Sequence, residues 1–240
     1  MKKFYDKHEL GFALIWIVLY VNLMSMADNA SRALGMEKLI SFPVTLVMSL
    51  VLLFWLRRHG LFEKYGLCAP KFPPRQFLYY LPLVLIVSCN AWLGLRMNMS
   101  AAESILYVLS MLCVGFLEEV IFRGLLFKAM CRDGVRAAII VSSVTFGIGH
   151  IVNLFNGSGA ELLATVCQVC YAIAAGFMFV IIFHRGGSLL PCIAAHSSIN
   201  MLSAFGVEAQ GMGEIYSALA LCLISTGYAL ILLKTLPKRE

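Results

Sequence analysis

The stretch FLEEVIFRG, residues 116–124, lies inside a long apolar segment of the chain. It contains two adjacent glutamates, Glu118 and Glu119, followed by Arg123. An ionised side chain in the middle of a lipid bilayer costs about 2.5–3.5 kcal/mol on insertion scales. Such groups therefore face a protein interior or a wet cavity, which makes these three residues candidates for function.

The composition of the whole chain is that of a protein that crosses a membrane several times. Of its 240 residues, 60% are hydrophobic and 13% are charged, whereas soluble domains average about 45–50% apolar and about 25% charged residues. The mean hydropathy is +0.85. The formal net charge of +6 is explained by positive loops on the cytoplasmic side of a membrane, so it gives no reason to expect nucleic-acid binding.

The apolar segments predict an all-α fold with about eight transmembrane helices in a single transmembrane domain, residues 1–240. A span needs about 20 apolar residues, and the second and seventh segments are short by this measure. The predicted spans are 10–27, 41–56, 77–95, 104–128, 136–154, 161–183, 188–206 and 214–234.

The distribution of positive charge predicts that both termini are cytoplasmic. With the N-terminus inside, fifteen of the 19 Lys and Arg residues fall on the cytoplasmic side, three fall outside, and Arg123 lies within a span. The apolar run after MKKFYDKHEL continues to about Met26, which is longer than the 7–15 residues of a signal-peptide core. We therefore expect a retained first span and a multi-pass protein of the cell membrane.

Helical spacing predicts different roles for the two glutamates. Glu119 and Arg123 are four residues apart, so their side chains can pair on one face of a helix. Glu118 lies about 100° around the helix from Glu119, so Arg123 cannot satisfy both carboxylates in the same geometry. We predict that Glu119 is held by Arg123 and that Glu118 is available for chemistry.

Few other strongly polar side chains occur in the predicted spans. His196 and Asn200 are four residues apart and share one helix face. His150 has the same spacing from Phe146, which would place an aromatic ring beside the imidazole. Each feature alone also occurs as simple packing between helices, so the functional interpretation depends on their combination on three spans.

Glycines in the FGIGH stretch, residues 146–150, indicate a close helix contact. Gly147 and Gly149 make this helix thin, and small residues let transmembrane helices approach closely.

Three motifs in this order resemble a known family. EEVIFR matches E-E-x-x-x-R, FGIGH matches F-x-x-x-H, and HSSIN matches H-x-x-x-N. The chain resembles the CPBP (Abi) family of intramembrane proteases, which includes the type II CAAX prenyl endopeptidases. The resemblance covers a motif-bearing catalytic core at about residues 104–206.

The resemblance implies hydrolysis of a peptide bond in a membrane-associated protein or peptide. Carried over to this chain, it implies that Glu118 activates a water with help from His150. It implies that His196 and Asn200 form the oxyanion hole. Glu119 and Arg123 would then brace the site.

The choice between a glutamate protease and a metalloprotease stays open at this point. Glu118, His150 and His196 offer two histidines and a carboxylate, a ligand set that zinc uses in catalytic sites. The chain has no H-E-x-x-H motif. We favour a metal-free mechanism, with zinc as the possible cofactor of the alternative.

Two other functions compete with the protease. A non-catalytic scaffold or immunity protein would bind a membrane partner and use the same motifs only for packing. A transporter would use intramembrane Glu, His and Arg as an ion relay. Transporters often carry inverted repeats, and no paired repeat is evident in this sequence.

Overall fold

The computed structural model describes residues 1–71 and 80–235, and in this part of the chain the regular structure is helical. The helices follow the apolar segments, because a helix satisfies its own main-chain hydrogen bonds in lipid. The elements are α1 Lys2–Lys7, α2 Glu9–Ala33, α3 Ser41–Arg58, α4 Leu81–Val87, η2 Ser88–Ala91, α5 Ala101–Glu118, η3 Glu119–Leu126, α6 Phe127–Met130, α7 Val135–Gly149, η4 His150–Leu154, α8 Leu162–Gly186, α9 Leu190–Leu202 and α10 Met212–Thr235.

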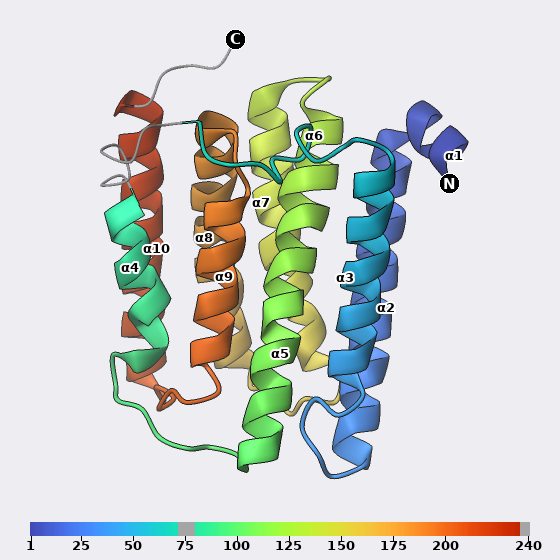
Figure 1. The fold of residues 1–240 in the computed structure, drawn as a ribbon. Helices are drawn as coiled ribbons and strands as arrows, with labels where there is room; N and C mark the ends of the chain where they lie inside the picture. The colour runs from blue at the N-terminus through green and yellow to red at the C-terminus, as the bar shows by residue number, and fades with distance from the viewer. Residues whose placement is uncertain (72–79, 236–240) are drawn as a thin grey trace.

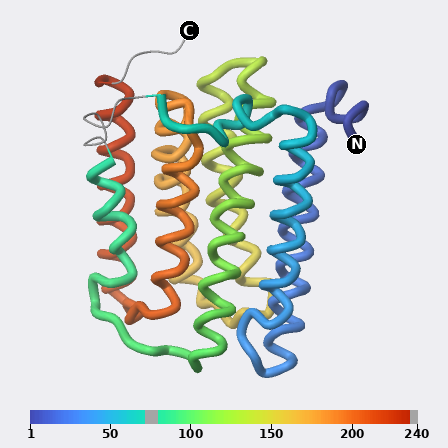
Figure 2. Tube along the Cα trace, in the orientation of Figure 1, coloured from blue at the N-terminus to red at the C-terminus, as the bar shows by residue number. Residues whose placement is uncertain are grey.

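Eight of the described helices stand side by side in two rows (Figure 1). One row runs α4, α9, α5 and α3, and each of these helices contacts the next. Behind it lie α10, α8, α7 and α2, with α2 packed against η3. The trace in Figure 2 places α1 and the end of α10 at the same end of the bundle, as predicted for the two termini.

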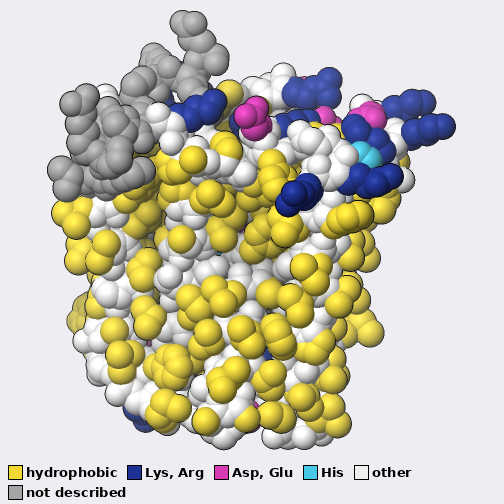
Figure 3. Space-filling view, in the orientation of Figure 1, with side chains coloured by type: hydrophobic (Ala, Val, Ile, Leu, Met, Phe, Trp, Pro, Cys, Tyr) yellow, Lys and Arg dark blue, Asp and Glu magenta, His cyan; other side chains and the backbone are white. Residues whose placement is uncertain are grey.

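Among the described residues, six helices are long and apolar enough to cross a membrane, and the protein is therefore a multi-pass membrane protein. Two of the eight predicted segments are shorter. Within the third, residues 80–91 are helical and residues 77–79 lie outside the described residues. The seventh is α9, with 13 residues. At 1.5 Å per residue, α9 extends over about 20 Å. It contacts α4 and α5, and Figure 3 shows a broad apolar belt on this face with most visible Lys and Arg at the α1 end.

Glycines set the closest approaches between helices. A Cβ built on Gly115 of α5 would lie 2.7 Å from the main-chain nitrogen and 2.8 Å from the Cα of Ser197 in α9. A Cβ on Gly147 of α7 would lie 2.8 Å from the main-chain nitrogen of Ile173 in α8. The predicted close contact at Gly147 is confirmed. The same prediction for Gly149 is wrong, because a Cβ there would have no neighbour within 4 Å.

We expect Gly115→Ala to destabilise the protein, because main-chain atoms of α9 cannot move aside as a flexible side chain can. Overpacking of this kind costs about 1–3 kcal/mol, which should lower the apparent melting temperature in detergent by several degrees. Gly227→Ala in α10 is the control, because its new Cβ would have no neighbour within 4 Å. Equal melting temperatures for the two variants would contradict the close contact.

The connection after α3 covers the end of the bundle at which α1 lies. Tyr65 is 1% exposed, and its hydroxyl is 2.6 Å from the hydroxyl of Tyr5 in α1. Burial and this hydrogen bond raise the pKa of the Tyr65 phenol far above its usual value. The main-chain N–H of Leu189 donates to Gly66 over 2.8 Å. The connection therefore ties α1 to the turn that precedes α9.

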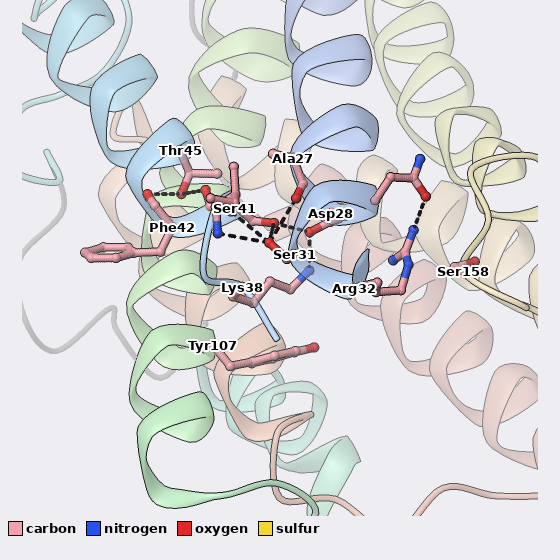
Figure 4. A network of polar contacts seen from close by, with 12 residues as sticks. Ala27, Asp28, Ser31, Arg32, Lys38, Ser41, Phe42, Thr45, Tyr107 and Ser158 are labelled. Carbon is pink, nitrogen blue, oxygen red and sulfur yellow. Dashed lines mark hydrogen bonds and ion pairs between the residues drawn. The ribbon is translucent and has the colours of Figure 1, made fainter. Parts of the chain in front are cut away.

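A polar network joins the connections at the opposite end (Figure 4). Asp28 of α2 lies 2.8 Å from the Lys38 ammonium and also accepts a hydrogen bond from the Ser41 hydroxyl. Arg32 donates to the main-chain oxygen of Asn156 over 2.9 Å. These contacts hold the start of α3 against the end of α2 and attach the segment that follows η4.

Candidate functional site

The E-E-x-x-x-R motif lies where α5 changes into a π-helix. Glu118 is the last residue of α5, and Glu119 is the first residue of η3, which continues to Leu126. All eight residues of η3 are buried. The predicted span 104–128 is helical throughout, and its part from Glu119 to Leu126 has the wider π-helical turn. π-Helical turns are rare, and they occur frequently at functional sites.

Glu119 and Arg123 form an ion pair in the protein interior. Oε1 of Glu119 lies 3.2 Å from Nη1 of Arg123, and both side chains are fully buried. The predicted pairing is therefore confirmed. The guanidinium carbon also lies 3.9 Å from the centre of the Phe146 ring, a cation–π contact. In the described residues the guanidinium nitrogens have no aligned hydrogen-bond acceptor, so Coulombic attraction and the ring contact balance the charge of Arg123.

His196 of α9 lies between the two glutamates. Its Nδ1 is 2.8 Å from Oε1 of Glu119, and its Nε2 is 3.3 Å from Oε2 of Glu118. With Nδ1 donating its proton to Glu119, a favourable contact between Nε2 and Glu118 requires one further proton between them. The imidazole also stacks on the ring of Phe179 in α8, with 5.8 Å between the ring centres. His196 is thereby fixed in position and orientation.

Phe146 connects the three motifs. Its ring contacts His150 and His196 edge to face, with centroid distances of 5.3 and 5.6 Å, and it also lies against Arg123. The predicted contact of Phe146 with His150 is confirmed. The first residue of η4 is His150, and its Nδ1 lies 3.2 Å from the main-chain oxygen of Phe146.

The other two predicted catalytic residues, His150 and Asn200, make no hydrogen bond to Glu118 or Glu119 in the described part of the chain. Within the described part of the chain, His150 makes no hydrogen bond or ion pair with Glu118, and its ring nitrogen Nδ1 is engaged with Phe146. Asn200 lies one turn beyond His196 in α9. Its contact in the described residues is through its main-chain oxygen, which accepts from Ser203 over 2.7 Å. The structure therefore brings His196, but not the amide of Asn200, against the carboxylates.

Tyr20 belongs to this constellation and was not among the predicted residues. It comes from α2, and its hydroxyl donates to Oε1 of Glu118 over 2.6 Å. A possible signal was its position within the apolar run IVLYVNL, residues 17–23, since transmembrane tyrosines concentrate at the membrane–water interfaces.

Glu118, His150 and His196 are not arranged as a metal site in this structure. Among the residues that the structure describes, no group of three His, Cys, Asp or Glu side chains is arranged to hold a metal ion. A catalytic zinc uses three protein ligands, and only Glu118 and His196 of the three candidates are in contact. The preference for a metal-free mechanism remains a prediction.

Residues 100–202 match the family model described as Type II CAAX prenyl endopeptidase Rce1-like. The matched region holds all three motifs and runs from the start of α5 to the end of α9. The relationship to the CPBP (Abi) family is thereby confirmed for this part of the chain, and it supports a protease-type enzyme. No curated protein and no solved structure matches the chain.

Proposed function

We propose that this relative of the type II CAAX prenyl endopeptidases is an intramembrane endopeptidase of the cell membrane. Its substrate class would be a membrane-associated protein or peptide. The observation that supports this most is the unequal surroundings of two adjacent carboxylates. Glu119 is paired with Arg123, whereas Glu118 lies outside that pair and faces His196.

In the proposed reaction Glu118 is the general base. It removes a proton from a water whose oxygen attacks the carbonyl carbon of the scissile peptide bond, and the carbonyl electrons move onto oxygen. Glu118 then returns the proton to the amide nitrogen as the carbon–nitrogen bond breaks. General acid–base catalysis of this kind contributes about 10²–10⁴-fold to the rate. His150 is the proposed second group that orients the water.

His196 and Asn200 are the proposed donors to the oxyanion. His196 lies between Glu118 and Glu119, with one ring nitrogen facing a carboxylate oxygen of each. An N–H at Nε2 could then donate to the developing negative charge, and such donors are most effective where water is excluded. Asn200 would have to turn its amide toward the substrate for this role.

Glu119 and Arg123 are proposed to support the site without touching the substrate. Both are fully buried, and Glu119 accepts the Nδ1–H of His196. This contact orients the imidazole as a carboxylate does in a serine-protease triad. The pair would therefore act on the reaction through His196.

Cleavage of a quenched peptide library by purified protein in nanodiscs tests the proposal. Wild type, Glu118→Gln and Glu208→Gln would be compared, each with and without a chelator. The last variant makes the same exchange at an exposed residue outside the site. We expect cleavage by wild type and Glu208→Gln with and without chelator, and none by Glu118→Gln. Loss of activity with chelator and recovery with zinc would favour the metalloprotease and its ligands Glu118, His150 and His196.

The scaffold alternative makes the opposite prediction for the same variants. A protein that only binds a membrane partner would cleave nothing, and its phenotype in cells would survive Glu118→Gln, which is nearly isosteric. Retained phenotype in that variant would contradict the proposed function.

A further inference from the structure

Tyr20 contacts Glu118 but lies outside the region that matches the family model. It lies in α2, whereas the match begins at residue 100. It is eleven residues beyond the start of α2 at Glu9, or about 16 Å along the helix. Tyr20 therefore lies near the middle of this 25-residue apolar helix, whereas transmembrane tyrosines concentrate near helix ends at the membrane–water interface.

The contact between Tyr20 and Glu118 has the geometry of a strong hydrogen bond. The distance of 2.6 Å from the phenol oxygen to Oε1 falls within the 2.5–2.7 Å that is typical of a hydroxyl donating to a carboxylate. Tyr20 is 7% exposed, and α2 packs directly against η3. The phenol therefore approaches Glu118 from a rigid, packed helix.

The two oxygens of Glu118 have different partners. Oε1 accepts the hydrogen bond of Tyr20, and Oε2 faces Nε2 of His196. A carboxylate held at both oxygens has a fixed plane, so the two partners determine the directions in which its remaining lone pairs point. We propose that Tyr20 is a positioning residue of the reaction: its hydrogen bond to Oε1, together with the contact of Oε2 with His196, holds the Glu118 carboxylate in the orientation in which it takes a proton from water.

This inference rests on the proposed function, because Tyr20 would act on the reaction only through Glu118. The test variant is Tyr20→Phe, which removes the hydroxyl and keeps the ring. Its control is Tyr228→Phe in α10, another buried tyrosine, whose hydroxyl has no hydrogen-bond partner among the described residues. Both exchanges remove one oxygen from a packed tyrosine within the bundle.

The expected result is a fall in kcat of about 10–100-fold for Tyr20→Phe, which corresponds to losing one hydrogen bond to a charged group. KM should stay within about twofold, since substrate binding is not removed. Tyr228→Phe should retain the wild-type values. A rise in KM at unchanged kcat would overturn the inference, because Tyr20 would then bind substrate.

A second measurement tests the contact without cleavage. Melting temperatures in detergent would be compared for Tyr20→Phe in the wild-type and Glu118→Met backgrounds. We expect the exchange to lower the melting temperature only where the Glu118 carboxylate is present, since coupled residues give non-additive effects. Equal shifts in both backgrounds would overturn the inference.

Failure of this inference can be separated from failure of the proposed function. Cleavage by Glu118→Gln at the wild-type rate would contradict the assignment of the base. An inactive Glu118→Gln together with wild-type kcat in Tyr20→Phe would contradict the role of Tyr20 alone.

Discussion

Replacing Glu118 by glutamine is expected to lower kcat by about 10²–10⁴-fold, the usual contribution of a general base. The amide has nearly the same shape as the carboxylate but cannot take a proton from water. Tyr20 can still donate to the amide oxygen at the position of Oε1, whereas the amide nitrogen takes the place of Oε2 opposite Nε2 of His196. Steady-state kinetics on a peptide selected from the library would measure the effect.

The melting temperature of Glu118→Gln shows whether a loss of activity comes from lost chemistry or from a loss of folded protein. We expect the apparent melting temperature of Glu118→Gln to lie within a few degrees of wild type, because the side chain of Glu118 is partly exposed rather than sealed in the interior. A variant that is inactive and also strongly destabilised would leave the loss of kcat without a catalytic explanation. A variant that is stable and fully active would exclude Glu118 as the base.

The sequence was sufficient to predict the features that depend on local spacing. Glu119 and Arg123 pair because residues four apart are neighbours on a helix surface. The spacing of Phe146 and His150 gives their ring contact for the same reason. Long apolar runs predicted the helices because a membrane restricts the choice of main-chain structure.

Other features of the site depend on contacts between distant parts of the chain. Tyr20 meets Glu118 across 98 positions of sequence, and helical periodicity cannot give the packing partner of a face. Spacing placed Asn200 on the same face as His196, but it does not determine the side-chain conformation of the amide. The π-helix beginning at Glu119 is likewise invisible to a pattern that assumes regular α-helical turns.

The short helices show a further limit of predicting membrane spans from hydropathy and length. α9 has only 13 residues and would be rejected as a span by length alone, yet it carries His196. Its neighbours α4 and α5 pack along it, so protein rather than lipid surrounds part of its length. Length rules assume a helix exposed to the full thickness of the bilayer.

The second large effect is expected for Glu119→Leu, which removes the counter-charge of Arg123. Both side chains of this pair are fully buried, and breaking a buried pair by removing one partner costs about 3–5 kcal/mol. We expect a large loss of monodisperse protein in size-exclusion chromatography and a much lower melting temperature. The exposed pair of Lys2 and Asp6 is the control, since surface pairs contribute little, and Asp6→Leu should melt close to wild type.

The double variant Glu119→Leu and Arg123→Leu is expected to recover much of this stability without recovering activity. Replacing a buried ion pair by apolar side chains removes both desolvation costs and is often neutral or stabilising. Leucine cannot accept the Nδ1–H of His196, however, so the imidazole loses the contact that orients it. A stable but inactive double variant would mean that the pair is retained for the position of His196 rather than for folding. Wild-type activity in the double variant would contradict that role, and a single Glu119→Leu variant as stable as wild type would mean that other groups compensate the charge of Arg123.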